Sequence, residues 1–184
     1  ISFLLQSVNI PVIYGARTSI DLIKNKLEDR SINYQNLEVI DSDTRIKTKY
    51  FDIEFIATTH SIPDSFGIVL HTPNGTIVST GDFKFDLTPI GPMADLHKMA
   101  RVGSEGVKLL LSDSTNALSE GFSKSEDIVD EALSDIVSGY NGRIIIATFA
   151  SNIYRVKHIA ETCQKNNRKI IVFGRSMENI TNLA

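Results

Sequence analysis

Short runs rich in β-branched and aromatic residues occupy the first two thirds of the chain. Gly, Pro, Asn and Asp separate them, a pattern typical of β-strands and turns. The runs are Val12 to Tyr14, Leu37 to Ile40, Phe51 to Ala57, Phe66 to Thr72, Thr76 to Ser79 and Val107 to Leu111. Together they predict a largely antiparallel sheet.

One pair of these runs predicts a hairpin. Asn74-Gly75 separates the runs ending at Thr72 and beginning at Thr76, and this dipeptide readily adopts the positive φ angles of a tight turn. With Asn74-Gly75 at the tip, we expect Gly67 to lie roughly opposite Asp82.

Apolar residues at helical spacing predict helices over Ser19 to Asp29, Met93 to Val102 and Ser125 to Ser138, and a short helical stretch over Ile1 to Val8. Ser123 and Glu126 have the spacing of a capping box, so they favour a helix start there.

The last third has a different order of elements. A strand over Arg143 to Thr148, a helix over Asn152 to Asn166 and a strand over Lys169 to Phe173 predict a βαβ unit with a right-handed crossover and a parallel sheet. We therefore expect an α/β fold. Because Ile1 begins an apolar stretch without a cap, and Ala184 ends a helix opened near Gly174, we also expect the chain to be an internal fragment.

Composition narrows the class of protein. With 42% hydrophobic residues among 184, the chain can bury a sizeable core. Its single cysteine, Cys163, excludes an intramolecular disulfide and a CxxC zinc knuckle, which favours the cytoplasm. No apolar run approaches the roughly 20 residues of a membrane span, and no secretory leader opens the chain. We therefore expect neither membrane association nor secretion.

The net charge of -3 argues against a general nucleic-acid coat, but the charges are segregated. Residues 119–142 hold six acidic residues against Lys124, whereas residues 143–175 hold seven basic residues against Glu161. Two interpretations stay open: solvated helix faces, or a basic flank that faces RNA.

Two segments carry candidate chemistry, Thr58 to Ser65 around His60 and Ser79 to Asp86 around Asp82. Each follows a predicted strand, and the hairpin between them shortens the distance that separates them. Imidazole and carboxylate are zinc-type ligands, and a carboxylate can bridge two ions. One His and one Asp also fit a structural loop histidine and a turn aspartate, so the residues alone leave both possibilities open.

Several longer motifs together resemble one known family. The runs TTHSIPDSFGIV, TGDFKFDLTPIG, LLLSDSTNA, ATFASNIYR and VFGRSMEN stand in this order along the chain. Their order and spacing resemble ribonuclease J of the β-CASP branch of the metallo-β-lactamase superfamily. The resemblance covers essentially the whole chain, and it is more specific than a lone His and Asp.

The resemblance implies roles for individual residues. His60 matches a metal-binding histidine, and Asp82 matches a carboxylate that bridges two zinc ions. Asp113, in SDSTNA, matches an acidic residue that orients a histidine near the scissile phosphate; it also fits a turn or N-cap aspartate. Ser151, Asn152 and Ile153 match a loop that contacts the RNA backbone, and an ordinary helix cap by Ser151 or Asn152 fits the same positions.

Other parts of the family pattern are absent. The HxHxDH zinc cluster and the later histidine motifs do not occur in the chain. His71, His97 and His158 have no H-x-x-x-H partner and are expected to be structural or solvent-facing.

The resemblance implies a partial metallo-β-lactamase domain over residues 1–116, followed by the N-terminal part of a β-CASP domain over 117–184. It implies a zinc-dependent hydrolase with two Zn²⁺ ions per intact site. Its substrate would be single-stranded RNA with a 5′-monophosphate, cut by 5′-to-3′ exonuclease and endonuclease activities in RNA maturation and decay. A homo-oligomer and RNA-decay partners are expected, and the fragment alone is expected to be inactive. Two alternatives are another hydrolase of the same fold and a non-catalytic nucleotide-binding or assembly module.

Overall fold

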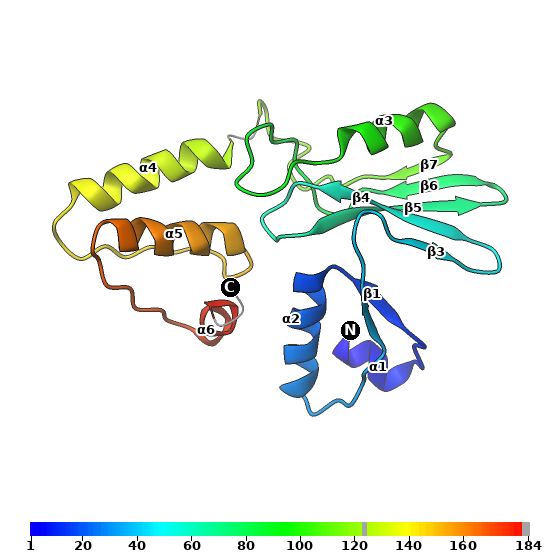
Figure 1. Ribbon diagram of the computed structural model, residues 1–184, viewed down its shortest axis with the longest axis horizontal. Helices are drawn as coiled ribbons and strands as arrows, with labels where there is room; N and C mark the ends of the chain where they lie inside the picture. The colour runs from blue at the N-terminus through cyan, green and yellow to red at the C-terminus, as the bar shows by residue number, and fades with distance from the viewer. Residues whose placement is uncertain (123–124, 182–184) are drawn as a thin grey trace. The chain divides into compact units, whose positions relative to one another are not determined.

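The computed structural model describes residues 1–122 and 125–181, and it is a mixed α/β structure with antiparallel and parallel sheets, as predicted (Figure 1). The chain divides into two compact units, each described by itself. The first unit comprises residues 1–58, 64–82 and 95–113, and the second comprises residues 59–63, 83–94 and 114 onward. The assignment of 1–116 and 117–184 to two family domains stays a prediction.

A five-stranded sheet forms most of the first unit. Its order is β3-β4-β5-β6-β7, antiparallel except for the parallel pair β6/β7, so the predicted largely antiparallel sheet is confirmed. The strands are β3 (Arg45–Lys47), β4 (Asp52–Thr58), β5 (Ser65–Thr72), β6 (Gly75–Ser79) and β7 (Leu109–Leu111). Strand β3 was not predicted, because its one apolar residue, Ile46, gives no pattern; it is ordered by pairing with Ile53 of β4.

The β5/β6 hairpin has a different turn from the predicted one. Thr72 pairs with Gly75, so the turn residues are Pro73 and Asn74. Pro73 cannot adopt a positive φ, and only Gly75 has one, at 123°. Because Ile68 pairs with Ser79, the register brings Gly67 beside Thr80 and not Asp82. A Cβ on Gly67 would lie 3.2 Å from the Ser79 carbonyl oxygen, so this approach favours glycine.

Helix α3 (Leu96–Glu105) covers one face of this sheet. Its Val102 and Met99 pack against a core of Ile56, Val69 and Val78 from the three central strands. The helix begins three residues later than predicted, because the carboxylate of Asp95 accepts a hydrogen bond from the Lys98 backbone N–H at 2.8 Å and caps it.

The N-terminal part of the first unit is a small βαβ arrangement. The elements are α1 (Ser2–Ser7), β1 (Ile13–Gly15), α2 (Arg17–Glu28) and β2 (Leu37–Val39). Strands β1 and β2 pair in parallel as a separate two-stranded sheet, so these two predicted strands do not belong to the antiparallel sheet. Helix α2 buries Ile20 and Leu27. The predicted helices at Ile1 to Val8 and Ser19 to Asp29 are confirmed within a few residues.

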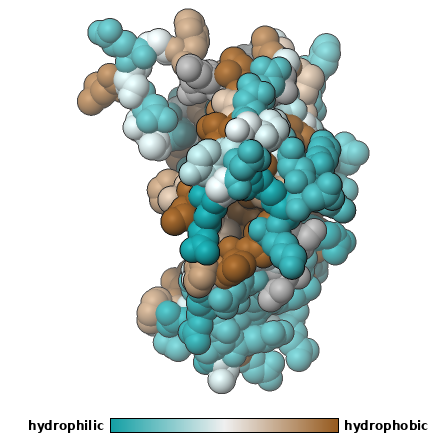
Figure 2. Space-filling view, turned by 90° about the vertical axis from the view of Figure 1, so that its left-hand side faces the viewer, coloured by the Kyte–Doolittle hydropathy of each residue, from teal (hydrophilic) through white to brown (hydrophobic). Residues whose placement is uncertain are grey.

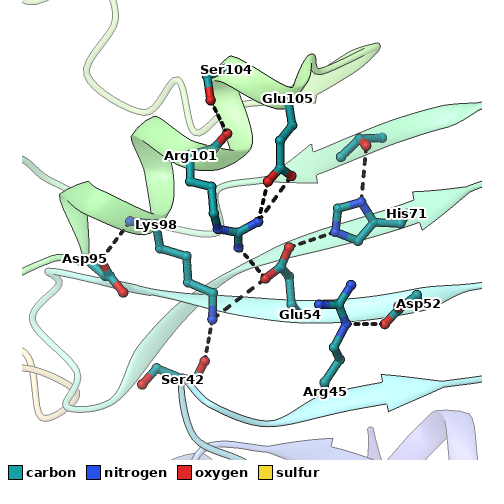
Figure 3. Close-up of polar contacts among 11 residues, drawn as sticks. Ser42, Arg45, Asp52, Glu54, His71, Asp95, Lys98, Arg101, Ser104 and Glu105 are labelled. Atoms are coloured by element: carbon teal, nitrogen blue, oxygen red, sulfur yellow. Dashed lines mark hydrogen bonds and ion pairs between the residues drawn. The ribbon is translucent and has the colours of Figure 1, made fainter.

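A buried carboxylate ties α3 to the sheet (Figure 3). Glu54 of β4 is 4% exposed and faces three cationic or histidine side chains. Its oxygens lie 2.7 Å from His71 Nε2, 2.7 Å from Arg101 Nη2 and 3.9 Å from Lys98 Nζ. Burial alone would raise the pKa of Glu54, but hydrogen bonds from His71 and Arg101 outweigh it and lower this pKa.

The second unit is built on helices α4 (Glu126–Gly139), α5 (Ile153–Lys165) and α6 (Arg175–Thr181). Helices α4 and α5 pack side by side (Figure 1). His158 joins them: its Nδ1 lies 3.1 Å from Asp130 on α4, and its Nε2 lies 3.1 Å from Thr162 on α5. This contact fits the structural role expected for His158. The predicted helices are confirmed, whereas Ser123 of the predicted capping box lies outside the described residues.

The two predicted strands that flank α5 are not strands in the structure. Arg143–Thr148 and Lys169–Phe173 run without sheet pairing, so the predicted βαβ unit is wrong for this structure. A strand requires a backbone partner, and neither segment pairs with another strand among the residues that the structure describes. Several of their apolar side chains stay exposed, with Ile145 at 90% and Phe173 at 84%. Figure 2 shows one face of the molecule, on which apolar residues lie at the surface among hydrophilic ones.

The Glu54 cluster generates a first prediction. Glu54→Gln removes the charge that three basic groups surround, so we expect the free energy of unfolding at pH 7 to fall by about 2 kcal/mol. Urea denaturation followed by circular dichroism measures this. Because the folded pKa of Glu54 lies below its ordinary value of 4.5, its stabilisation is complete above that pH and is lost as the pH falls through the lowered pKa.

Glu105→Gln is the matched control. This carboxylate also binds Arg101, at 2.9 Å, but is 49% exposed, so the change should cost less than about 0.5 kcal/mol. Equal losses for both variants would contradict the special role of Glu54.

Candidate functional site

Three candidate residues follow strands that run in the same direction. Because β4/β5 and β5/β6 are antiparallel and β6/β7 is parallel, strands β4, β6 and β7 share one direction. His60 comes two residues after β4, Asp82 three residues after β6 and Asp113 two residues after β7. Their strands therefore end at the same edge of the sheet, where loops commonly hold functional groups.

Backbone bonds fix the ends of β6 and β7 to one another. The Thr80 N–H donates to the Leu111 carbonyl at 3.0 Å, and the Asp113 N–H donates to Thr80 Oγ1 at 2.9 Å. Gly81 takes a φ of 60°, which turns the chain directly before Asp82. Asp82 is exposed and Asp113 half-buried, and both belong to the first unit.

The segment that carries His60 belongs to the second unit. There Thr59 forms a bridge with Lys84, whose N–H donates to the Thr59 carbonyl at 2.9 Å. The segment of His60 is thus hydrogen-bonded to the one that directly follows Asp82. Within residues 1–122 and 125–181 no group of three or more His, Cys, Asp or Glu side chains is positioned to hold a metal ion.

Asp86 anchors the segment that follows Asp82. Its carboxylate accepts hydrogen bonds from Ser125 Oγ at 2.8 Å, the Glu126 N–H at 3.2 Å and the Thr88 N–H at 3.1 Å, and lies 3.1 Å from Lys84 Nζ. Burial alone would raise the pKa of Asp86, but these donors outweigh it and lower the pKa to about 2. Asp86 therefore caps the start of α4 from a distant part of the chain.

Glu126 continues this network. Its Oε1 lies 3.0 Å from Lys84 Nζ, and its Oε2 accepts a hydrogen bond from Arg155 Nη2 of α5. Sequence reasoning assigned no role to Lys84 or Asp86, and it expected Glu126 only in a capping box with Ser123. For Lys84 and Asp86 the signal was their alternation in TGDFKFD, which does not reveal that partners of Asp86 come about 40 residues later.

The segment expected to contact RNA begins α5. Asn152 Oδ1 accepts a hydrogen bond from the Arg155 N–H at 3.1 Å, so Asn152 is the N-cap of the helix. Ser151 is exposed, whereas the Ile153 side chain is buried in the second unit. Only the backbone of Ile153 is left for a ligand. The structure thus contains the helix cap that the sequence left open as an alternative, and RNA contact at these residues stays a prediction.

His71 and His97 have the expected character. His71 binds Glu54 and Thr76 within the first unit, and His97 lies exposed on α3.

Among the residues that the structure describes, no helix is long and apolar enough to cross a membrane.

The sequence of this chain is similar to a protein-family model and to several curated proteins. The family described as "Ribonuclease J, beta-CASP domain" matches residues 141–184. The chain is 50% identical over 179 residues to ribonuclease J 1 of Streptococcus pyogenes, a match covering 97% of this chain and 32% of that protein. It is 43% identical over 183 residues to ribonuclease J of Synechocystis, covering 98% of this chain and 29% of that protein.

A solved structure has a related fold. It is a protein of unknown function from Enterococcus faecalis V583, with a TM-score of 0.63 and 14% identity, over 92% of this chain and 42% of the other. The β-CASP domain model thus matches the last quarter of the chain, whereas the curated ribonuclease J proteins align with nearly all of it. The chain is homologous to a segment of ribonuclease J proteins along nearly its whole length, and it spans about a third of the length of the curated relatives it matches.

Asp86 generates the second prediction. Asp86→Asn removes a charged cap and one of the two described carboxylate partners of Lys84, so the free energy of unfolding at pH 7 should fall by roughly 1 to 2 kcal/mol. The lowered pKa stabilises the fold fully above pH 3.8, and this stabilisation is lost as the pH falls toward about 2. Urea denaturation across this range should show wild type and variant converging.

Asp135→Asn, at an exposed position on α4, is the control and should leave stability nearly unchanged. A constant difference between wild type and Asp86→Asn from pH 7 to pH 2 would contradict the charged role of Asp86.

Proposed function

We propose that the intact protein is a metal-dependent ribonuclease that hydrolyses RNA phosphodiester bonds. The observation that carries this proposal is the similarity to ribonuclease J proteins along nearly the whole chain, at 38 to 50% identity. The common direction of the strands that precede His60, Asp82 and Asp113 supports it, because catalytic groups gather at such an edge.

We propose zinc as the metal, with His60 and Asp82 among its ligands. The donor set fits: a neutral imidazole and a carboxylate are ordinary zinc ligands. When bound, two zinc ions would lower the pKa of a shared water and neutralise charge on the phosphate. Two side chains do not complete a dinuclear site, so residues 1–184 alone should bind zinc weakly and cleave nothing.

Other residues would act on the substrate. Asp113 would orient a neighbouring group near the scissile phosphate, and its backbone bond to Thr80 holds it at the end of β7. Ser151 and Asn152 would contact the RNA backbone from the start of α5, where backbone N–H groups suit an anionic phosphate.

The finer assignments rest on the family alone. They are a single-stranded substrate with a 5′-monophosphate, 5′-to-3′ exonuclease and endonuclease modes, a role in RNA maturation and decay, a homo-oligomer, and RNA-decay partners. A cytoplasmic location is compatible with Cys163, a buried free thiol. Parallel assays with 5′-phosphorylated RNA, DNA and thioester substrates separate this function from other hydrolases of the fold.

The ligand assignment generates a third prediction. In the intact protein, His60→Ala and Asp82→Asn should each lower the rate of RNA hydrolysis at least roughly a hundredfold, since each removes a metal ligand. Asp82→Asn should lower zinc content more, because a bridging carboxylate binds both ions. The measurements are turnover of 5′-phosphorylated RNA and zinc content after dialysis.

His97→Ala and Asp43→Asn, both at exposed positions, are the matched controls and should retain wild-type turnover. Near-normal turnover with full zinc in either test variant would show that the ligand assignment is wrong.

The α5 loop generates a fourth prediction. Ser151→Ala and Asn152→Ala should each weaken RNA binding less than about tenfold, because backbone amides stay in place. Asn152→Ala should also lower the free energy of unfolding by about 1 kcal/mol through loss of the cap. Binding of a 5′-phosphorylated RNA, followed by fluorescence anisotropy, measures the first effect, and Ser138→Ala on α4 is the control. Unchanged affinity in both test variants would exclude side-chain contact with RNA.

A further inference from the structure

Glu126 occupies a singular position among the described ion pairs of the second unit, because each of its two carboxylate oxygens binds a cation from a different segment. One is Lys84, which follows Asp82; the other is Arg155, in the first turn of α5. We propose that Glu126 is a positioning residue that couples the proposed metal loops to the proposed RNA-binding loop. This inference rests on the function proposed above.

The first half of the coupling runs from the His60 segment to Glu126. Lys84 is held by its backbone, which donates to the Thr59 carbonyl at 2.9 Å, next to His60. It is held again by its ammonium group, 3.0 Å from Glu126 and 3.1 Å from Asp86. A displacement of the Thr59–Pro63 segment therefore displaces a charge that Glu126 binds.

The second half runs from Glu126 to the start of α5. Arg155 donates through Nη2 to Glu126 and through its backbone N–H to Asn152 Oδ1, at 3.1 Å. Its buried Nε has no hydrogen-bond partner among the described residues, so in this part of the chain Glu126 is the acceptor that fixes the guanidinium. Movement of Asn152 is thereby transmitted to the same carboxylate.

A packing contact runs parallel to these ion pairs. A Cβ placed on Gly91 would lie 2.2 Å from the Tyr154 hydroxyl oxygen, so Tyr154 rests directly on the backbone of the segment that follows Asp82. The first turn of α5 thus touches residues 83–94 directly through Tyr154 and is linked to Lys84 indirectly through Glu126. This arrangement suits the transfer of a small displacement between packed groups.

The cluster of Lys84, Asp86, Glu126 and Arg155 contains two cations and two carboxylates, so its charges balance. Lys84 and Arg155 offset Asp86 and Glu126, and the side chains of Lys84, Glu126 and Arg155 are each only 22 or 23% exposed. Burial alone would raise the pKa of Glu126, but the bonds from Arg155 and Lys84 outweigh it and lower the pKa, so the carboxylate is ionised at neutral pH. Its neutralisation leaves Lys84 paired with Asp86 and removes the described ion pair of Arg155, which weakens the link without emptying the space.

The coupling is testable as a thermodynamic linkage in the intact protein. Zinc affinity is measured by chelator competition, with and without a 5′-phosphorylated RNA that carries phosphorothioate linkages to resist hydrolysis. If the loops are coupled, RNA tightens zinc binding, and by reciprocity zinc tightens RNA binding by the same factor. We expect a factor of about 5 to 10 for the wild-type protein, within the usual range of coupling.

Glu126→Gln should reduce this factor to nearly 1 while changing zinc affinity without RNA less than about threefold, since Glu126 is not itself a ligand. Glu161→Gln is the matched control: it is a carboxylate on α5, 49% exposed and 4.0 Å from Lys157, and it should keep the factor. Lys84→Met breaks the other arm and should also abolish the factor, which keeps the test valid if Glu126→Gln does not fold.

The outcomes separate the two proposals. Zinc binding by the wild-type protein without any effect of RNA would overturn the coupling alone, as would full coupling in Glu126→Gln or Lys84→Met. Failure of the wild-type protein to bind zinc would overturn the proposed metal site, and the coupling with it.

Discussion

The need to pair buried carboxylates organises both units of this protein. A carboxylate that leaves water without partners costs several kcal/mol, so each buried one gathers donors from distant parts of the chain. Glu54 draws α3 onto the sheet through Arg101 and Lys98. Asp86 and Glu126 bind Lys84, the start of α4 and the start of α5. A few acidic residues therefore join elements that lie far apart along the chain.

The strand directions explain why candidate chemistry lies where it does. Strands β4, β6 and β7 run the same way, so the residues after them, including His60, Asp82 and Asp113, follow one edge of the sheet. The antiparallel β5 returns the chain between two of these ends and contributes the core residue Val69. The core residues lie within the strands, whereas the candidate functional residues lie in the loops that follow them. The loops can therefore vary in sequence without loss of core packing.

The ion pairs that join Lys84, Glu126 and Arg155 constrain the segments that follow the strands. Residues that follow a proposed metal ligand are bonded to the helix that begins at the proposed RNA loop, through Lys84, Glu126 and Arg155. Because charge pairs in a partly buried setting are less screened than surface pairs, such a network can hold loops in a defined arrangement. The proposed hydrolysis would need metal and substrate held in this way.

The local pattern of hydrophobic and polar residues determined those helices and strands whose pattern is complete within a single segment of the sequence. The sequence predicted the strands β4, β5 and β6, the helices α2, α4 and α5, and the placement of His60 and Asp82 just beyond strands. Motif resemblance indicated the family.

Tertiary structure decided the features that depend on a partner elsewhere in the chain. Arg45–Lys47 became a strand through β4, whereas Arg143–Thr148 and Lys169–Phe173 formed none without a pairing backbone. Pro73 moved the hairpin turn and its register. The roles of Glu54, Asp86 and Glu126 were hidden because a carboxylate's function depends on which donors the fold brings to it, and most of those donors lie 17 to 47 residues away along the chain.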